Sequence, residues 1–333
     1  MMKKVMNAPQ AYVDEMLSGL CGAHPEYYRQ FGLQNRVIGR PNAPIEGKVG
    51  IVTGGGSGHL PVFTGYVGEG LLDACAIGNV FASPTVDQIA EAIRVANGGK
   101  GVLLLYGNYG GDVMNFEMAA EMLELEGILT QTVVVADDVA SAPPEDSQKR
   151  RGVAGMVLGF KTAGAKAAQG ARLAEVAAVA QKTLDATRTM GVALTPCTVP
   201  EAGNPTFEIG DDEMEIGMGI HGEPGVRRGP LTTAADITRE ILEGILGDQP
   251  LANGDKVCAM INSLGATPPE ELYIVYGHVA SKLNDLGVEI AVPLVGRYAT
   301  SMEMAGLSIS ICKLDDEIQS LLKASCDCAF WKV

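Results

Sequence analysis

The chain has few of the groups that proteins use to bind nucleic acid or to enter membranes. Among its 333 residues, 25 lysines and arginines stand against 40 aspartates and glutamates, which gives a net charge of −15. Nucleic acids and anionic membrane surfaces both require a basic footprint, so this balance argues against either partner. No apolar run approaches the roughly 18 residues of a membrane span, and the first residues lack the apolar core of a signal peptide. We therefore expect a cytoplasmic protein.

Cysteine and histidine are too few and too dispersed to suggest a metal site. The seven cysteines are odd in number, and only Cys326 and Cys328 are close together. No further cysteine or histidine pair stands near them to complete a zinc site. We expect reduced thiols and no bound metal. The chain has only four histidines, His24, His59, His221 and His278.

The usual nucleotide-binding motifs are also missing. The stretch Gly-Gly-Gly-Ser-Gly at 54–58 is not followed by the Gly-Lys-Ser/Thr of a Walker A loop. Gly217, Gly219 and Gly222 do match the spacing G-x-G-x-x-G, but that signature must open a helix. Pro224 follows two residues later, so no helix can begin where a pyrophosphate would bind. We predict that this chain binds no nucleotide cofactor itself.

What the chain has in abundance is glycine, with 42 residues, together with short apolar runs and few aromatics. This composition favours an α/β fold in which buried strands end in tight turns. We predict two α/β domains, residues 1–188 and 189–333, each a sheet covered by helices on both faces. The expected strands are 49–56, 101–111, 130–139, 192–199, 257–265, 288–296 and 307–314. The expected helical regions are 83–99, 115–127, 150–191, 267–287 and 315–325.

Two glycine-rich turns of the first domain contain residues that can do chemistry. His59 follows Gly55, Gly56 and Ser57 at the carboxyl end of an expected strand, where open α/β sheets bind ligands. The glycines allow a main chain to approach a small ligand closely, although a tight turn with a surface histidine would look the same. Asp112 stands in a second such turn. It is either a helix cap or, beside the first turn, a proton acceptor for a substrate hydroxyl.

His221 stands in the glycine-rich stretch "EIGMGIHGEPG" of the second domain. An imidazole with a free nitrogen in a tight pocket can be an acid or base, a metal ligand or a nucleophile. A histidine with no chemical role is the simpler alternative. His59, Asp112 and His221 would also suit a metal, but the close histidine spacing that anchors most metal sites is missing.

Six stretches taken together are similar to the substrate-binding K subunit of dihydroxyacetone kinases. They are "GGGSGH", "NYGGDVMNFEMA", "RRGVAG", "EMEIGMGIHGEPG", "INSLGATPPEELY" and "YATSMEMAGLSIS", and the resemblance extends from about residue 10 to 325. It implies a homodimeric α/β subunit that binds a small ketose. The activity it implies is that of a phosphotransferase with an alcohol group as acceptor.

The resemblance also implies roles for individual residues. His221 matches the histidine that attacks the ketone carbonyl and holds the substrate as a hemiaminal. His59 matches the pocket histidine, beside the backbone of Gly55 and Gly56. Asp112 matches the acidic residue that accepts the proton of the reacting terminal hydroxyl.

By the same resemblance, the nucleotide and Mg²⁺ belong to a separate helical L-type subunit. That partner would carry ATP, or ADP recharged by a phosphoprotein of a sugar phosphotransferase system. Some relatives are non-catalytic ketose sensors that activate a transcription regulator, which is the alternative function.

Two positions depart from the family pattern. Leu60 stands where glutamate is usual, and Gly107 where lysine is common. Both changes remove charge beside the expected pocket and either enlarge it or make it less polar. Dihydroxyacetone, erythrulose and apulose are all candidate substrates.

Overall fold

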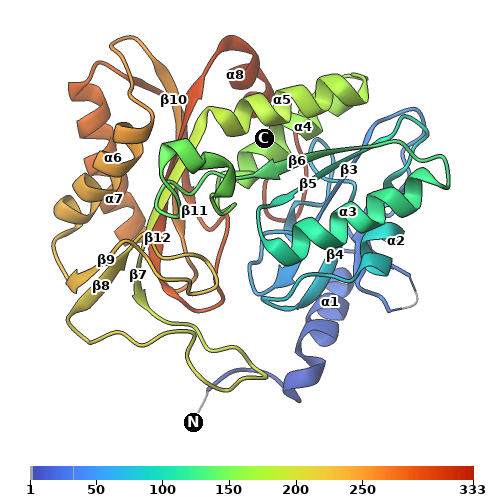
Figure 1. Ribbon diagram of the computed structural model, residues 1–333, viewed down its shortest axis with the longest axis horizontal. Helices are drawn as coiled ribbons and strands as arrows, with labels where there is room; N and C mark the ends of the chain where they lie inside the picture. Colours follow the sequence, from blue (N-terminus) through green and yellow to red (C-terminus); the bar gives the residue numbers. More distant parts are fainter. Residues whose placement is uncertain (1–2, 33) are drawn as a thin grey trace.

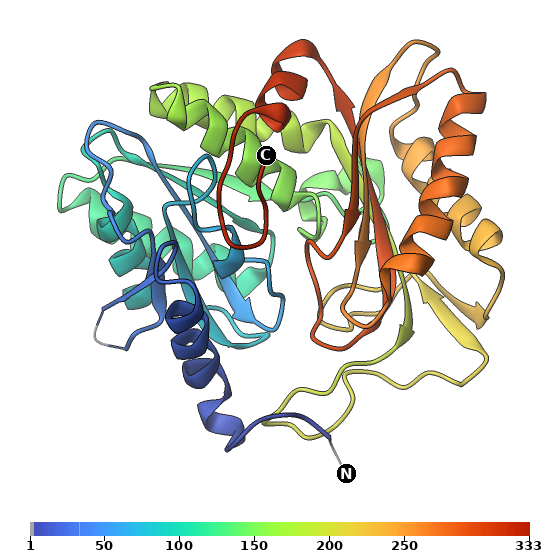
Figure 2. The same cartoon turned by 180° about the vertical axis from the view of Figure 1, so that it is seen from behind.

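The computed structural model describes residues 3–32 and 34–333, and two six-stranded sheets lie side by side in it (Figures 1 and 2). The first sheet has the order β1-β2-β4-β3-β5-β6. Its strands are β1 (Arg29–Phe31), β2 (Val37–Gly39), β3 (Gly50–Ser57), β4 (Ala74–Val80), β5 (Val102–Gly107) and β6 (Thr130–Val135). The last four run parallel, so the carboxyl ends of β3 and β5 meet at one edge of the sheet.

The second sheet is mostly antiparallel and has the order β11-β10-β12-β7-β8-β9. Its strands are β7 (Thr187–Thr195), β8 (Glu213–Ile216), β9 (Arg227–Pro230), β10 (Lys256–Ser263), β11 (Glu289–Gly296) and β12 (Ala305–Leu314). Only β10 and β11 are parallel, and they enclose a helix just as β5 and β6 do. Both segments are therefore β-α-β units.

Helices cover both faces of each sheet, as the sequence predicts. They are α1 (Tyr12–Ala23), α2 (Val86–Ala96), α3 (Gly110–Glu124), α4 (Met156–Ala168), α5 (Leu173–Asp185), α6 (Ala234–Asp248), α7 (Pro269–Asp285) and α8 (Asp316–Lys323). In β3, Val52 packs towards α2 and α3, whereas its neighbour Ile51 packs towards α4 and α5, because successive strand side chains point to opposite faces. In the second sheet α6 and α7 cover one face, and α8 with part of α4 covers the other. None of the helices in the described ranges is long and apolar enough to cross a membrane.

The seven expected strands are all present, but two helix starts differ from the prediction. Helix α3 begins at Gly110, before the expected start at residue 115. Helix α2 begins at Val86 rather than at residue 83, because Thr85 caps it: the Gln88 backbone N–H donates to the Thr85 hydroxyl, and the Gln88 side chain accepts from the Thr85 N–H.

The expected helical region 150–191 is not one helix but contains two helices and the start of a strand. Helix α4 ends at Ala168, Gly170 adopts a positive φ of 78°, and α5 starts at Leu173. A positive φ is the backbone conformation that glycine adopts at little cost and that ends helices. Strand β7 begins at Thr187 and already belongs to the second sheet. The boundary near residue 188 remains our proposal.

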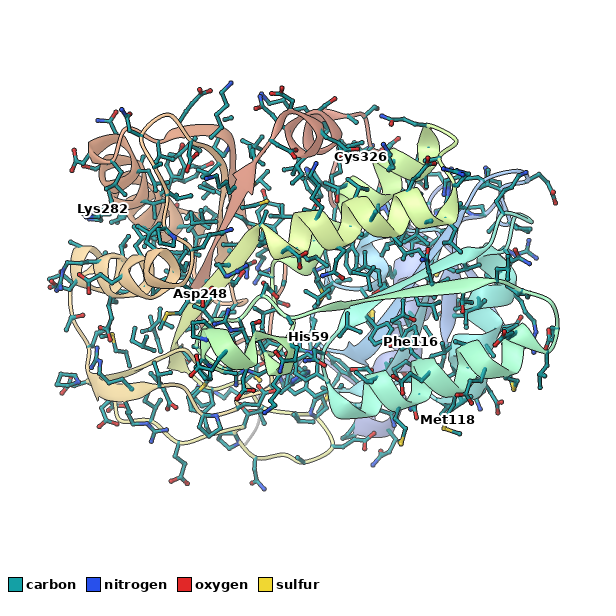
Figure 3. All side chains as sticks on the ribbon, turned by 45° about the horizontal axis from the view of Figure 1, so that its top comes forward. His59, Phe116, Met118, Asp248, Lys282 and Cys326 are labelled. Atoms are coloured by element: carbon teal, nitrogen blue, oxygen red, sulfur yellow. The ribbon has the colours of Figure 1, made fainter. Side chains whose placement is uncertain are left out.

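The loop that follows β3 is held by the second domain. The Met302 N–H donates to the Gly58 carbonyl at 2.8 Å, and the Thr300 hydroxyl donates to the Leu60 carbonyl at 3.0 Å. Figure 3 shows His59, which lies in this loop, between the two sheets. The end of β3 therefore faces the β11–β12 loop of the second sheet.

Candidate active site

His59 and His221 are 162 residues apart in the sequence and lie in direct contact in the fold. Their Nε2 atoms are 3.0 Å apart, and the ring planes are nearly perpendicular. His59 comes from the loop after β3, and His221 from the loop between β8 and β9. The two histidines thus come from loops of different sheets.

The outer ring nitrogen of each histidine has an acceptor of its own. His59 Nδ1 lies 2.6 Å from the Thr300 carbonyl oxygen, and His221 Nδ1 lies 2.9 Å from Glu223 Oε1. Carbonyl and carboxylate oxygens only accept, so both Nδ1 atoms must carry hydrogen. Each ring therefore presents Nε2 to the other, and a hydrogen bond between them requires one shared proton.

Glu223 is a site residue that the sequence analysis did not identify. Besides the ring of His221, its carboxylate accepts the His221 backbone N–H at 2.9 Å. A β-carbon at Gly219 would lie 2.2 Å from Glu223 Oε2, so glycine is needed where the carboxylate folds back. Burial would raise the pKa of Glu223, but its bonds with His221 lower it to about 2. The available signal was a carboxylate two residues after the histidine in the same turn.

Aromatic rings surround the two imidazoles. Phe81 stacks on His59 with the centroids 4.9 Å apart, and Phe81 and Tyr109 both meet His221 edge to face. His59 is 1% exposed, and this burial, together with the charge of His221, lowers the pKa of His59 to about 3. His59 is therefore uncharged at neutral pH in the ketose-free chain.

The glycines of the GGGSGH turn are required by the packing of the protein itself. A β-carbon at Gly55 would lie 2.2 Å from the Phe63 ring, and one at Gly56 would lie 2.6 Å from the Ala82 backbone nitrogen. The Ser57 hydroxyl is buried and has no hydrogen-bond partner within the described residues. Contact of this turn with a ligand remains a prediction.

Asp112 lies in the first turn of α3 and is 8% exposed. Burial raises the pKa of its carboxyl to about 6, against the smaller opposing effects of the Ser83 hydroxyl and of His221. Its Oδ1 atom accepts no hydrogen bond from the part of the chain that the structure describes. A buried carboxylate oxygen without a donor is suited to take a proton or a hydrogen bond from a bound hydroxyl.

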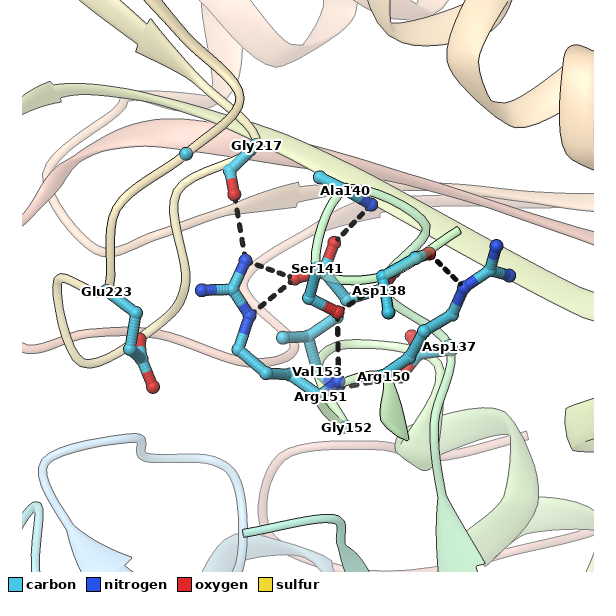
Figure 4. A network of polar contacts seen from close by, with 12 residues as sticks. Asp137, Asp138, Ala140, Ser141, Arg150, Arg151, Gly152, Val153, Gly217 and Glu223 are labelled. Carbon is cyan, nitrogen blue, oxygen red and sulfur yellow. Dashed lines mark hydrogen bonds and ion pairs between the residues drawn. The ribbon is translucent and has the colours of Figure 1, made fainter. Parts of the chain in front are cut away.

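Arg151 positions the loop that carries His221, and the sequence analysis gave it no role (Figure 4). Its guanidinium donates to the Asp138 carboxylate at 2.8 and 2.9 Å and to the Gly217 carbonyl at 2.9 Å. Gly217 has a positive φ of 79° at the first turn of that loop. Arg151 therefore ties the first residue of the loop to the segment after β6.

The two departures from the family pattern have different surroundings. A β-carbon at Gly107 would lie 3.1 Å from the Tyr109 ring, so that ring occupies the space and the pocket is not enlarged there. Leu60 lines a cavity of about 400 Å³ together with Met16 and Met302. The lining of that cavity also includes Lys4, Arg297 and Glu303, so the surroundings of Leu60 remain charged.

Residues 18–330 match the family model described as the Dak1 domain. The chain belongs to the Dak1 family. PTS-dependent dihydroxyacetone kinase 1, dihydroxyacetone-binding subunit DhaK, of Listeria innocua is 47% identical over 332 residues, 99% of this Dak1 chain and all of the relative. D-erythrulose kinase of Mycolicibacterium smegmatis is 43% identical over 99% of the Dak1 chain, which spans only 57% of that relative. The resemblance inferred from the motifs is confirmed.

Solved structures agree with this assignment. Dihydroxyacetone kinase of C. freundii in its native form matches with a TM-score of 0.90 and 30% identity, over all of the Dak1 chain and 60% of that chain. The dihydroxyacetone kinase operon co-activator Dha-DhaQ matches with a TM-score of 0.86 and 32% identity, over 94% of the Dak1 chain and 96% of that chain. The α/β fold is thus shared by kinases and by a co-activator.

Proposed function

We propose that this chain is the substrate-binding subunit of a small-ketose kinase and that it binds the ketone covalently, as a hemiaminal on His221 Nε2. The observation that carries the proposal is the contact of His221 with Glu223, which commits Nδ1 and leaves Nε2 as the nucleophilic nitrogen. A three- or four-carbon polyol offers little surface for ordinary contacts. A reversible bond to carbon supplies affinity and selects ketones over alcohols of the same shape.

The histidine pair supplies both the nucleophile and the proton for this step. The shared proton first moves from His221 Nε2 to His59 Nε2, which frees the His221 Nε2 lone pair. That lone pair forms a bond to the carbonyl carbon, while the C=O π electrons move to oxygen. The proton shared with His59 moves to that oxygen and yields a hydroxyl. His221 then carries the positive charge that the pair held before, opposite the Glu223 carboxylate. Atoms and charge are therefore balanced without another reactant.

Asp112 is proposed to accept the proton of the terminal hydroxyl when that oxygen attacks phosphorus. Its unpartnered oxygen and the raised pKa support this role. Phosphoryl transfer otherwise needs positioning and charge neutralisation. We expect a helical L-type subunit to supply both with bound Mg²⁺ and either ATP or ADP. If the nucleotide is ADP, a phosphotransferase-system phosphoprotein recharges it. We also expect this chain to form a homodimer.

Dihydroxyacetone and the erythruloses are the substrates that the relatives favour, because these relatives include a dihydroxyacetone-binding subunit, a D-erythrulose kinase and an L-erythrulose kinase. Leu60 lines a cavity of about 400 Å³ beside Ser57 and Gly58 of the turn that carries His59, so a longer or branched ketose is also compatible. A coupled assay with the helical partner, over dihydroxyacetone, both erythruloses and apulose, identifies the substrate.

The second candidate function is a ketose sensor that regulates transcription, which the similarity to Dha-DhaQ supports. A sensor needs the covalent anchor but no proton acceptor for phosphoryl transfer. The buried, unpartnered Asp112 oxygen favours the kinase. Transfer of phosphate to the ketose in the presence of the partner subunit would exclude a purely sensory role.

The covalent step is tested by ¹³C NMR with dihydroxyacetone labelled at the carbonyl carbon. In the wild-type protein the bound signal should leave the carbonyl region and appear among sp³ carbons bonded to nitrogen and oxygen. His221→Ala should show no such signal, and His278→Ala, an exposed change on α7, should behave as wild type. A bound ketone that keeps its carbonyl resonance would overturn the mechanism.

A further inference from the structure

The histidine pair has the outer contacts that proteins give to metal-binding imidazoles. A ligating histidine usually donates its other ring N–H to a carboxylate or a backbone carbonyl, which fixes the ring and its tautomer. Here His221 Nδ1 faces the Glu223 carboxylate and His59 Nδ1 faces the Thr300 carbonyl. Both Nε2 atoms are thereby left facing one space.

We propose that His59 Nε2 and His221 Nε2 together bind a divalent transition-metal ion such as Zn²⁺, in place of the proton that they share. Zinc bonds to imidazole nitrogen at about 2.0–2.1 Å, so two such ligands in a tetrahedral arrangement are about 3.3 Å apart. The observed separation is 3.0 Å. The two rings therefore need to move by only a few tenths of an ångström.

The chemistry of the ligands selects the class of metal. Imidazole nitrogen suits zinc, copper, nickel and cobalt, whereas magnesium and calcium prefer oxygen. The described residues contain no group of three or more histidine, cysteine or carboxylate ligands, so water fills the remaining positions. A site with two protein ligands binds more weakly than a structural zinc centre, and we expect reversible binding.

The charges near the pair favour a cation. The Glu223 carboxylate lies 2.9 Å from His221 Nδ1, and the buried Asp112 Oδ1 has no hydrogen-bond partner among the described residues. Arg151, the nearby cation, is already paired with Asp138. The metal replaces a proton, so its binding strengthens as the pH rises.

The metal uses the same His221 lone pair that the proposed function assigns to the ketone. Zinc should therefore inhibit ketose binding competitively, with the inhibition relieved by a chelator or by excess ketose. This consequence rests on the proposed function, but the binding of the metal to the ketose-free chain does not. Metal binding and competition with the ketose can therefore be tested separately.

The test is calorimetric titration of the full chain with Zn²⁺ in the absence of ketose. We expect binding to the wild type and to His278→Ala, and at least a tenfold loss of affinity in His59→Ala and in His221→Ala. Cobalt(II) gives a second readout, because a tetrahedral site with nitrogen ligands produces visible absorption bands that both variants should lose.

Circular dichroism and thermal unfolding of both variants verify that the fold is retained. His59→Gln and His221→Gln, which keep more of the side-chain volume, replace any alanine variant that does not fold. Zinc affinity equal to that of the wild type in folded His59 and His221 variants would overturn the proposal and point to the thiols instead. Absence of zinc binding to the wild type would overturn it as well.

Discussion

Glu223 accepts hydrogen bonds from two nitrogens of one residue, the backbone N–H and the ring Nδ1 of His221, both at 2.9 Å. A single carboxylate thus fixes the turn and the orientation of the imidazole within it. The side chain is 31% exposed, yet both of its oxygens are engaged in this contact. Loop geometry and nucleophile orientation therefore depend on the same group.

Replacing Glu223 with glutamine should impair capture of the ketone. The amide keeps one acceptor oxygen and puts an NH₂ donor against one of the two donating nitrogens, so the tautomer of His221 is no longer fixed. Changes of this kind typically cost about 10- to 100-fold in activity. We expect a loss of that size in kcat/KM in a coupled assay with the partner subunit. Glu208→Gln, an exposed change, is the control, and equal losses in the two variants would argue against the assigned role.

Asp112→Asn should stabilise the protein while removing its activity. Burial raises the pKa of this carboxyl from 3.8 to about 6, which corresponds to an unfavourable energy on the order of 3 kcal/mol for the ionised form. Asparagine keeps the shape without the charge. The gain in unfolding free energy should be full above pH 6 and shrink as the pH falls towards 3.8. Chemical denaturation at pH 7.5 and pH 4.5 measures it, and a destabilised variant at pH 7.5 would contradict the prediction.

The pH profile of turnover should follow the same carboxyl. A proton acceptor must be ionised, so kcat should fall as the pH drops below about 6 and level off above it. The wild-type profile, measured with the partner subunit in excess over pH 5–8, shows whether this limb exists. If the midpoint of the fall in kcat at acid pH does not shift when the partner concentration changes, the titrating group belongs to this chain. A flat profile down to pH 5 would exclude Asp112 as the base.

Arg151→Lys should loosen the loop that carries His221. An ammonium group lacks the planar fork that reaches both the Asp138 carboxylate and the Gly217 carbonyl. We expect kcat/KM to fall by about tenfold and the unfolding free energy by about 1–3 kcal/mol, because one buried contact is left unmade. Arg172→Lys, on an 84% exposed side chain, should change neither. Retention of wild-type ketone capture in Arg151→Lys would show that the loop holds its shape without this contact.

Gly55→Ala and Gly19→Ala should have opposite effects on stability. The new β-carbon at Gly55 would lie 2.2 Å from the Phe63 ring, and overpacking of this kind typically costs about 1–3 kcal/mol. Gly19 lies in α1, and no neighbouring atom of the described residues stands within 4 Å of where a β-carbon would be, so alanine should stabilise that helix by about 0.5–1 kcal/mol. Urea denaturation of both variants gives the sign of each change in unfolding free energy.

The sequence predicted seven strands because they are apolar runs, four of which end at glycine. It did not predict β4, whose segment Ala74–Val80 consists largely of small residues, or the short strands β1, β2, β8 and β9. It placed His59, Asp112 and His221 near strand ends and helix starts, where turns with glycine are recognisable. The contact between His59 and His221 joins two domains, and no local pattern encodes such a long-range approach.

Glu223 and Arg151 were missed for different physical reasons. Glu223 acts through a bond within its own turn, and only the backbone geometry shows that its side chain folds back onto His221. Arg151 acts at a distance of 66 residues in the chain, on a carbonyl oxygen that every residue possesses. Side-chain chemistry alone therefore identifies reacting groups more readily than the groups that orient them.

Met302 and Thr300 of the β11–β12 loop bind the loop after β3. The distance and orientation of the two histidine rings therefore depend on how the two halves of the chain pack together. Neither half contains a complete pair, so the ring nitrogen signals of His59 in ¹⁵N NMR should report every substitution that alters the fit, however remote. Chimaeras that combine halves from two relatives should lose the pair before they lose either fold.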